Sequence, residues 1–285
     1  MKRIEPLVRD DAIVSTNTSG LPIRDIAAGC SASFRQRFLG THFFNPPRYL
    51  KLLELIPTPD TNPDVLERVA SFGRVQLGKG IVVAKDTPNF IGNRIGIFAM
   101  MDAMRFVTED EYTIEEIDTL TGPLTGRPRS ATFRTADVVG LDVMRHVSQN
   151  LYDSIPDDEQ RDRFAIPELL NQLIEQGALG AKTRAGFYKK EGRDILSIDQ
   201  ATGTYTAATP LDLGDIGALK KAGSLADRLR ALYADEGRAG AFFRASSHAL
   251  FSYSAMRVPE ISENPADVDR AIQWGFGWEM GPFAM

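Results

Sequence analysis

The sequence contains one cysteine, Cys30, and three histidines among its 285 residues. A single thiol excludes a disulfide bond within the chain and a zinc site built from cysteines, and it is typical of a protein from a reducing compartment. The histidines are His42, His146 and His248. They lie far apart in the sequence and show none of the spacings found in zinc enzymes. The composition therefore argues against a bound metal.

Long apolar runs and an excess of positive charge are also missing. No stretch approaches the ~20 apolar residues that cross a bilayer, and the first residues are too charged for the apolar core of a signal peptide. The net charge of −5 argues against a nucleic-acid partner, because phosphate binding needs clustered Lys and Arg. With 43% hydrophobic and 25% charged residues, the composition predicts a soluble, folded protein of about two domains, located in the cytoplasm.

Short apolar runs predict four strands in the first 89 residues, at residues 12–14, 38–44, 52–57 and 80–85. A helix is predicted over residues 62–77, where Val65, Val69 and Phe72 recur at helical spacing. Its start is marked by Asn62 followed by a proline. Because strands alternate with helical segments, we predict an α/β layer with a largely parallel sheet.

From Phe90 onward the apolar pattern becomes helical. The first predicted helix carries an apolar stripe that includes Ile91, Ile95 and Phe98. Further helices are predicted over residues 113–120, 131–151, 166–177, 219–232 and 239–257, and a small hairpin over residues 191–206. The second part of the chain is therefore expected to be all-α apart from this hairpin.

An internal repeat links two parts of the helical region at a nearly constant offset of about 151 residues. The matched residues are Arg105, Asp118, Gly126 and Phe133 in the first copy and Arg257, Asp269, Gly277 and Phe283 in the second. Such a repeat indicates a duplicated unit. Because units of similar shape usually pack as the subunits of a dimer do, we expect the two copies to pack around a pseudo-two-fold axis.

The densest chemical signal is the run from Thr41 to Pro46, followed by Glu54 twelve residues after His42. His42 ends a predicted strand, where functional groups of open α/β sheets are found, and Glu54 lies on the next strand. Either a hairpin or a crossover between these strands would bring the two side chains together. Neutral histidine is an effective general base near pH 7, and a carboxylate on its second ring nitrogen fixes the tautomer. The alternative is a buried structural histidine, with Glu54 on an exposed strand face.

Other polar residues also have two interpretations. The hydroxyl and amide groups from Ser15 to Gly20 follow a predicted strand and either bind a ligand or cap the next helix. Asn93 either caps the helix after Asp86 or reaches into a cleft. Lys182 is either a ligand-binding cation or a solvated loop residue.

Together, these residues resemble the 3-hydroxyacyl-CoA dehydrogenase family. The segments that carry the resemblance are Asn17–Ser19, His42–Pro46, Glu54, Asp86–Arg94, Val139–Asp142 and Lys182–Tyr188. It extends over essentially the whole chain, and the combination of motifs is very specific. It favours the functional interpretation of His42, Glu54, Ser19 and Asn93.

The resemblance implies a fold that is α/β in one part and all-α in the other. A partial Rossmann-like sheet, the remainder of an NAD-binding domain, would occupy residues 1–89. A first helical domain of the family's C-terminal type would occupy residues 90–190, and residues 191–206 would form a linker hairpin. A second helical copy, truncated at its end, would occupy residues 207–285.

The resemblance also implies an enzyme of fatty-acid β-oxidation that oxidises (3S)-3-hydroxyacyl-CoA to 3-oxoacyl-CoA with NAD. His42 would be the catalytic base, supported by Glu54, and no metal would take part. Ser19 and Asn93 would bind the substrate. The residues along the cofactor would be Asn17, Ser19, Asn45 and Lys182.

The same resemblance also implies partners of the chain and a segment that this sequence lacks. It implies an enoyl-CoA hydratase module or a thiolase as a partner, and a pseudo-dimer of helical domains within one chain. The GxGxxG fingerprint of a Rossmann domain is absent, and Met1 would fall in a helix that follows that fingerprint. We therefore expect the chain as given to bind NAD weakly or not at all. The alternative is a non-catalytic fragment, or an acyl-CoA-binding or assembly module.

Overall fold

The computed structural model describes residues 1–110 and 112–285 of the chain. The chain forms two compact units: the first contains Met1–Gly96 and Ser252–Ala284, and the second contains Ile97–Phe251. The domain boundaries expected from the family resemblance differ from this division. Of the expected domain 207–285, residues 207–251 belong to the second unit and residues 252–284 to the first. The C-terminal residues thus belong to the unit that contains the N-terminal sheet.

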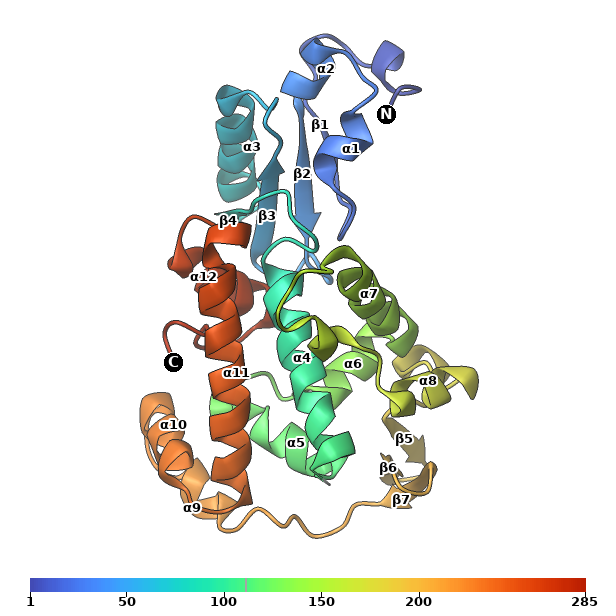
Figure 1. The fold of residues 1–285 in the computed structure, drawn as a ribbon, viewed down its shortest axis with the longest axis vertical. Coiled ribbons are helices and arrows are strands. Elements are labelled where there is room, and N and C mark those ends of the chain that lie inside the picture. The colour runs from blue at the N-terminus through green and yellow to red at the C-terminus, as the bar shows by residue number, and fades with distance from the viewer. Residues whose placement is uncertain (111) are drawn as a thin grey trace. The chain divides into compact units, whose positions relative to one another are not determined.

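A four-stranded sheet forms the framework of the first unit, and its strand order is β1–β2–β3–β4 (Figure 1). The strands are β1 (Val14–Thr16), β2 (Phe38–Phe43), β3 (Leu52–Pro57) and β4 (Gly80–Val83). The connections between parallel strands contain the helices α1 (Ile23–Ala27), α2 (Ala32–Gln36) and α3 (Pro63–Val75). Helix α3 begins where the sequence predicts, because the Asn62 side chain accepts a hydrogen bond from the Asp64 N–H.

The sheet is largely parallel, as expected, and its central pair of strands is joined by the hairpin, one of the two connections that the sequence left open. Strands β1 and β2 are parallel, as are β3 and β4, but β2 and β3 are antiparallel. The connection over residues 44–51 contains Pro46 and Pro47 and is too short for a crossover, which needs about a dozen residues. The antiparallel register places His42 directly opposite Glu54.

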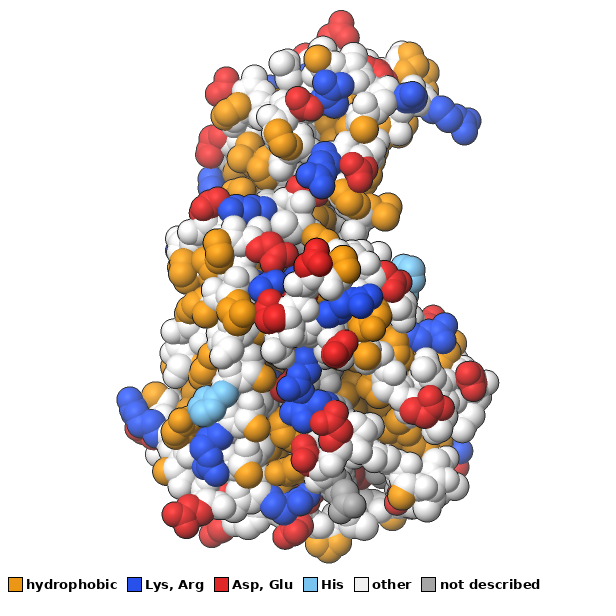
Figure 2. All heavy atoms as spheres, viewed as in Figure 1, with side chains coloured by type: hydrophobic (Ala, Val, Ile, Leu, Met, Phe, Trp, Pro, Cys, Tyr) orange, Lys and Arg blue, Asp and Glu red, His pale blue; other side chains and the backbone are white. Residues whose placement is uncertain are grey.

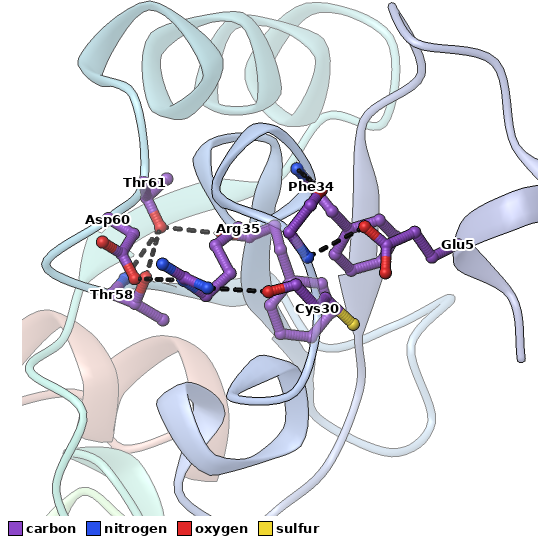
Figure 3. A network of polar contacts seen from close by, with 9 residues as sticks. Glu5, Cys30, Phe34, Arg35, Thr58, Asp60 and Thr61 are labelled. Carbon is purple, nitrogen blue, oxygen red and sulfur yellow. Dashed lines mark hydrogen bonds and ion pairs between the residues drawn. The ribbon is translucent and has the colours of Figure 1, made fainter. Parts of the chain in front are cut away.

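A polar network fixes the ends of β2 and β3 that lie away from His42 (Figure 3). Arg35 donates to Asp60 at 2.7 Å and to the Cys30 carbonyl at 2.7 Å. The Thr61 hydroxyl donates to the Phe38 carbonyl at 2.7 Å and accepts from the Thr58 N–H at 2.9 Å. The network joins α2 and the first residue of β2 to the loop after β3. It therefore supports the register of the central strand pair.

Two C-terminal helices complete the first unit. They are the end of α11 (Arg238–Ile261) and α12 (Pro265–Phe276), a helix that the sequence pattern did not predict. Helix α12 lies beside β4 (Figure 1), where the Trp274 ring fills the space next to Gly80. A Cβ atom at Gly80 would lie 2.3 Å from this ring, so close packing requires glycine there.

The second unit is mainly helical. It contains most of α4 (Gly92–Glu109), the first part of α11 and six further helices. These are α5 (Ile114–Leu120), α6 (Phe133–Val139), α7 (Leu141–Ser154), α8 (Glu168–Glu175), α9 (Ile216–Lys220) and α10 (Leu225–Ala234). Short 3-10 turns of this unit lie at Pro123–Thr125, Arg161–Phe164 and Ala181–Thr183, and the first unit has one at Glu5–Leu7.

Two predictions for the second unit need correction. The helix expected over residues 131–151 is two helices, because Gly140 between α6 and α7 has a φ of 102° that ends the first helix. The expected hairpin is a three-stranded antiparallel sheet of β5 (Tyr188–Glu191), β6 (Asp194–Asp199) and β7 (Thr204–Ala207). The prediction missed one strand, because the predicted hairpin starts at residue 191, where β5 ends.

In the described part of the chain, no helix is long and apolar enough to cross a membrane. On the face shown in Figure 2, acidic and basic side chains are interspersed rather than separated by sign. Among the described residues, no cluster of three or more His, Cys, Asp or Glu side chains has the arrangement of a metal site.

A half-buried carboxylate, Asp118, anchors the start of α6 in the second unit. It accepts hydrogen bonds from the backbone N–H groups of Thr132 at 3.1 Å and Phe133 at 2.7 Å, and from the Tyr188 hydroxyl at 2.9 Å. Burial raises the pKa of Asp118 to about 6, although these hydrogen bonds act in the opposite direction. The folded state therefore binds a proton at Asp118 more tightly than the unfolded state does.

This raised pKa predicts a pH-dependent stability. The contribution of Asp118 is fully present below about pH 4 and is lost as the pH rises through about 6. The free energy of unfolding should therefore fall, relative to that of Asp118→Asn, by up to about 3 kcal/mol between pH 4 and pH 7. Urea unfolding of both proteins at several pH values measures this difference. Asp157→Asn, at an exposed position of the same unit, controls for the lost charge. A pH-independent difference between wild type and Asp118→Asn would contradict the prediction.

Candidate active site

His42 and Glu54 form a buried hydrogen-bonded pair at the centre of the sheet. His42 Nδ1 lies 2.6 Å from Glu54 Oε2, and the two residues are 3% and 0% exposed. Their opposite positions in the β2–β3 register place both side chains on one face of the sheet. The contact expected from the sequence is therefore present. A carboxylate oxygen only accepts, so Nδ1 carries the proton and Nε2 remains an acceptor.

The second oxygen of Glu54 binds the start of α4. Glu54 Oε1 accepts from the N–H groups of Ile91 at 3.1 Å and Gly92 at 2.8 Å. These groups belong to the positive end of the helix, which favours a negative charge on the carboxylate. Asn89 and Phe90, directly before them, have left-handed φ values of 60° and 54°. Such strained backbone is characteristic of functional sites, and here it precedes the turn that binds Glu54.

Polar residues after β1 reach the same edge of the sheet. The Ser19 hydroxyl lies 3.1 Å from His42 Nε2, and the Asn17 side chain accepts from the Phe43 N–H at 2.9 Å. Because β1 and β2 are parallel, their carboxyl ends meet at one edge, the usual ligand-binding edge of an open α/β sheet. Ser19 is exposed, so the acceptor nitrogen of His42 lies beside a hydroxyl group that solvent reaches.

Aromatic rings enclose the imidazole. The Phe44 ring centroid lies 4.8 Å from that of His42, and the Phe90 centroid lies 5.5 Å away. Phe44 also packs on Gly92, where a Cβ atom would lie 2.5 Å from the ring. Sequence reasoning did not assign a role to either ring. The signal was available in the motif itself, because both phenylalanines lie within a few residues of predicted site residues.

The remaining predicted site residues lie in different places. Asn93 is half-buried in the first turn of α4, next to the groups that bind Glu54. Asn45 is exposed in the loop after β2. Lys182 belongs to the second unit, where its ammonium group pairs with both carboxylate oxygens of Asp142 at 2.5 and 2.7 Å. The structure thus places Glu54 and Ser19 each in direct contact with His42, and Asn17 follows the adjacent strand β1.

This arrangement suits proton transfer. A buried imidazole has a carboxylate on one ring nitrogen and an available acceptor on the other, beside an exposed hydroxyl group. Such a group takes a proton from a bound alcohol while the carboxylate stabilises the imidazolium that forms. The site contains no thiol, because Cys30 is a buried free cysteine on a different segment.

Two family models match successive parts of the chain. Residues 1–87 match the model of the 3-hydroxyacyl-CoA dehydrogenase NAD binding domain, and residues 90–190 match the model of the C-terminal domain of the same family. Together they cover about two thirds of the chain. A "Probable 3-hydroxyacyl-CoA dehydrogenase" of Bacillus subtilis is 46% identical over 274 residues, which are 96% of this chain and 35% of the relative.

Two further similarities cover almost the whole chain. A Rickettsia felis protein, whose name describes a fatty acid oxidation complex trifunctional enzyme, is 30% identical over 99% of this chain and 38% of its own length. The chain thus spans little more than a third of these two relatives. The fold matches 3-hydroxybutyryl-CoA dehydrogenase of Escherichia coli with a TM-score of 0.70 at 18% identity, over 99% of this chain and 69% of that one. The matched domain models and the 46% identity lead to one conclusion: the chain belongs to the 3-hydroxyacyl-CoA dehydrogenase family.

Proposed function

We propose that the chain carries the catalytic base of an NAD-dependent oxidation of (3S)-3-hydroxyacyl-CoA to 3-oxoacyl-CoA. The observation that carries this proposal is the buried His42–Glu54 pair, whose free imidazole nitrogen lies 3.1 Å from the exposed Ser19 hydroxyl. The reaction class follows from the family to which the chain belongs. The chemistry of fatty-acid β-oxidation is therefore the proposed context.

Each residue has a separate task in the proposed reaction. His42 Nε2 takes the proton of the substrate 3-hydroxyl group, and the electron pair of the O–H bond forms the C=O bond at C3. NAD, when bound, accepts the hydride that leaves C3. Glu54 holds Nδ1–H and stabilises the imidazolium. Ser19 and Asn93 bind the acyl substrate near its reacting oxygens.

The residues at the sheet edge are suited to bind the nicotinamide end of NAD. Asn17 and Ser19 follow β1, and Asn45 follows β2, so amide and hydroxyl groups gather where an open α/β sheet binds its ligand. We propose that these three residues hold the cofactor. The family resemblance adds Lys182 as a proposed cofactor-binding residue, and its ammonium group is paired with Asp142.

The proposal is tested by assaying the purified protein with a short 3-oxoacyl-CoA, such as acetoacetyl-CoA, and NADH. Because weak NAD binding is expected of this chain, the assay is run at high NADH concentrations, where loss of the NADH absorbance at a rate proportional to protein concentration is the expected result. Calorimetric titration with the acyl-CoA and with NAD measures binding separately from turnover. Acyl-CoA binding without turnover, at every NADH concentration, would instead favour an acyl-CoA-binding or assembly module.

We propose two related helical domains within the chain, at residues 90–190 and 207–285, joined by the linker 191–206 and preceded by the sheet domain 1–89. Matching local structures support this duplication. Gly126 and Gly277 both end a helical turn with φ 70° and ψ 24°. Asp118 accepts from the Phe133 N–H at 2.7 Å, and Asp269 accepts from the Phe283 N–H at 2.8 Å.

The apolar stripes of the two copies support packing of one copy against the other. Ile91, Ile95 and Phe98 in the first copy are buried, as are Phe242, Leu250 and Tyr253 in the second. Phe106 of α4 and Phe242 of α11 lie with their ring centroids 4.7 Å apart. We propose that this pairing forms a pseudo-dimer within one chain.

A protein that covers these stripes internally should be a monomer. Light scattering over a range of concentrations is expected to give the mass of one chain. Hydrogen exchange along α11 should be slow and should not depend on protein concentration. A dimer that persists on dilution and protects the amides of α11 only in the dimeric state would contradict the proposal.

The name of the Rickettsia relative suggests a partner. A trifunctional fatty acid oxidation complex joins several activities, and the 3-hydroxyacyl-CoA that this site would oxidise must be supplied by hydration of an enoyl-CoA. We propose an enoyl-CoA hydratase module as the supplier of substrate and a thiolase as the consumer of the 3-oxoacyl-CoA product.

A further inference from the structure

The C-terminal segment Ser252–Ala284 belongs to the same compact unit as the catalytic pair. It lies more than 150 residues beyond His42 and Glu54 in the sequence. Two groups of contacts nevertheless connect it to the residues that surround the pair. One group is aromatic and the other is polar.

The aromatic connection runs from α12 to the imidazole through one ring. Phe276 packs edge-on against Phe44, with ring centroids 5.9 Å apart, and Phe44 packs on His42 at 4.8 Å. Two glycines make room for these rings. A Cβ atom at Gly96 would lie 2.0 Å from the Phe276 ring, and one at Gly275 would lie 3.2 Å from the Phe44 ring. Phe276 therefore limits where Phe44, and with it the imidazole ring, can lie.

The polar connection runs from α11 to the first turn of α4. The Arg94 side chain, 1% exposed, donates from Nε to the Tyr253 hydroxyl at 2.6 Å and pairs with Glu260 at 3.3 Å. Tyr253 is completely buried. Arg94 follows Gly92, whose N–H group binds Glu54, by only two residues. A buried charge held by fixed partners resists displacement, so α11 fixes the turn that binds the Glu54 carboxylate.

We propose that Tyr253 and Phe276 are positioning residues of the His42–Glu54 pair. Tyr253 acts through Arg94 and the first turn of α4 on Glu54, and Phe276 acts through Phe44 on His42. The inference rests on the proposed function of the pair as a catalytic base. The proposal gives the second helical copy a part in the site, although the pair itself lies wholly on β2 and β3.

The test compares Tyr253→Phe and Phe276→Leu with two matched variants of the second unit. Tyr112→Phe removes a hydroxyl group that donates to the Arg238 carbonyl, and Phe187→Leu removes a buried ring that packs on Phe133. Both positioning variants are expected to lower kcat by about 10-fold and to change KM by less than about twofold, because misplaced catalytic groups slow the chemical step. The matched variants should lower stability without changing kcat of the folded protein.

Imidazole NMR supplies a readout that does not depend on turnover. The chain has only three histidines, so the Nδ1–H signal of His42 has few other imidazole signals with which to overlap. We expect it to shift in both positioning variants and to remain unchanged in the matched ones. Glu260→Gln, at a half-exposed position, replaces Tyr253→Phe if that variant does not fold.

The outcomes separate the two proposals. An inactive wild-type protein whose His42 signal still shifts in the positioning variants would contradict the proposed function and support the positioning role. An active protein whose variants lose only thermal stability, with kcat and the His42 signal unchanged, would overturn the positioning role and leave the proposed function in place.

Discussion

Replacing His42 by glutamine is expected to lower kcat by a factor of about 10² to 10⁴, with little change in KM. Glutamine fills similar space and keeps polar atoms near Glu54 and Ser19, but its amide does not accept the proton of the 3-hydroxyl group. Proton transfer belongs to the transition state, so its loss affects kcat more than substrate binding. Steady-state kinetics with acetoacetyl-CoA and NADH measure both constants.

His146→Gln is the matched control for this prediction. His146 is exposed on α7 of the second unit, and the same substitution there removes an imidazole without touching the site. It should leave kcat and KM unchanged. If His42→Gln retained kcat within about tenfold of the wild type while both variants remained folded, another group would have to be the base.

Contacts between neighbouring strands of this site could be predicted from the sequence, whereas contacts between distant segments could not. The four strand positions and the His42–Glu54 contact were predictable, because apolar runs mark strands and because the two residues lie on successive strands. The direction of β3 relative to β2 was left open between a hairpin and a crossover. The length of the loop at residues 44–51 contained this information, since a parallel crossover does not fit in it.

Contacts between distant segments were beyond the sequence patterns. Nothing in the local sequence of α12 indicates that Phe276 packs on Phe44, because periodicity reports which side of a helix is apolar but not what it covers. Arg94 is a partial exception. A charged residue within the apolar stripe of Ile91, Ile95 and Phe98 signals a buried charge that needs partners, although it does not identify Tyr253 and Glu260.

Replacing Glu54 by glutamine is expected to be almost as damaging as replacing His42, although it changes only one atom. Glu54 now accepts three hydrogen bonds, one from His42 Nδ1 and two from the start of α4. Glutamine has one oxygen and one NH2 group. If the oxygen faces the two backbone N–H groups, the NH2 group faces Nδ1 and donates to it. The imidazole proton must then move to Nε2, the nitrogen that should accept the substrate proton.

A histidine held in the wrong tautomer loses about 10³- to 10⁴-fold in kcat in enzymes that rely on such a pair, so we expect a loss of this size. The mismatch should also lower the free energy of unfolding by about 1–3 kcal/mol. Nitrogen-15 NMR of the imidazole determines the tautomer directly, and kinetics with acetoacetyl-CoA and NADH determine kcat.

Glu116→Gln separates the catalytic effect from the structural one. Glu116 is also buried at a helix start, where it accepts from the N–H groups of Thr113 at 3.0 Å and Asp212 at 2.7 Å, but it lies in the second unit. The same substitution there should lower stability and leave kcat unchanged. A Glu54→Gln protein that keeps the Nδ1–H tautomer and near wild-type kcat would mean that the carboxylate only supports the fold. The proton acceptor would then act without the charge of Glu54.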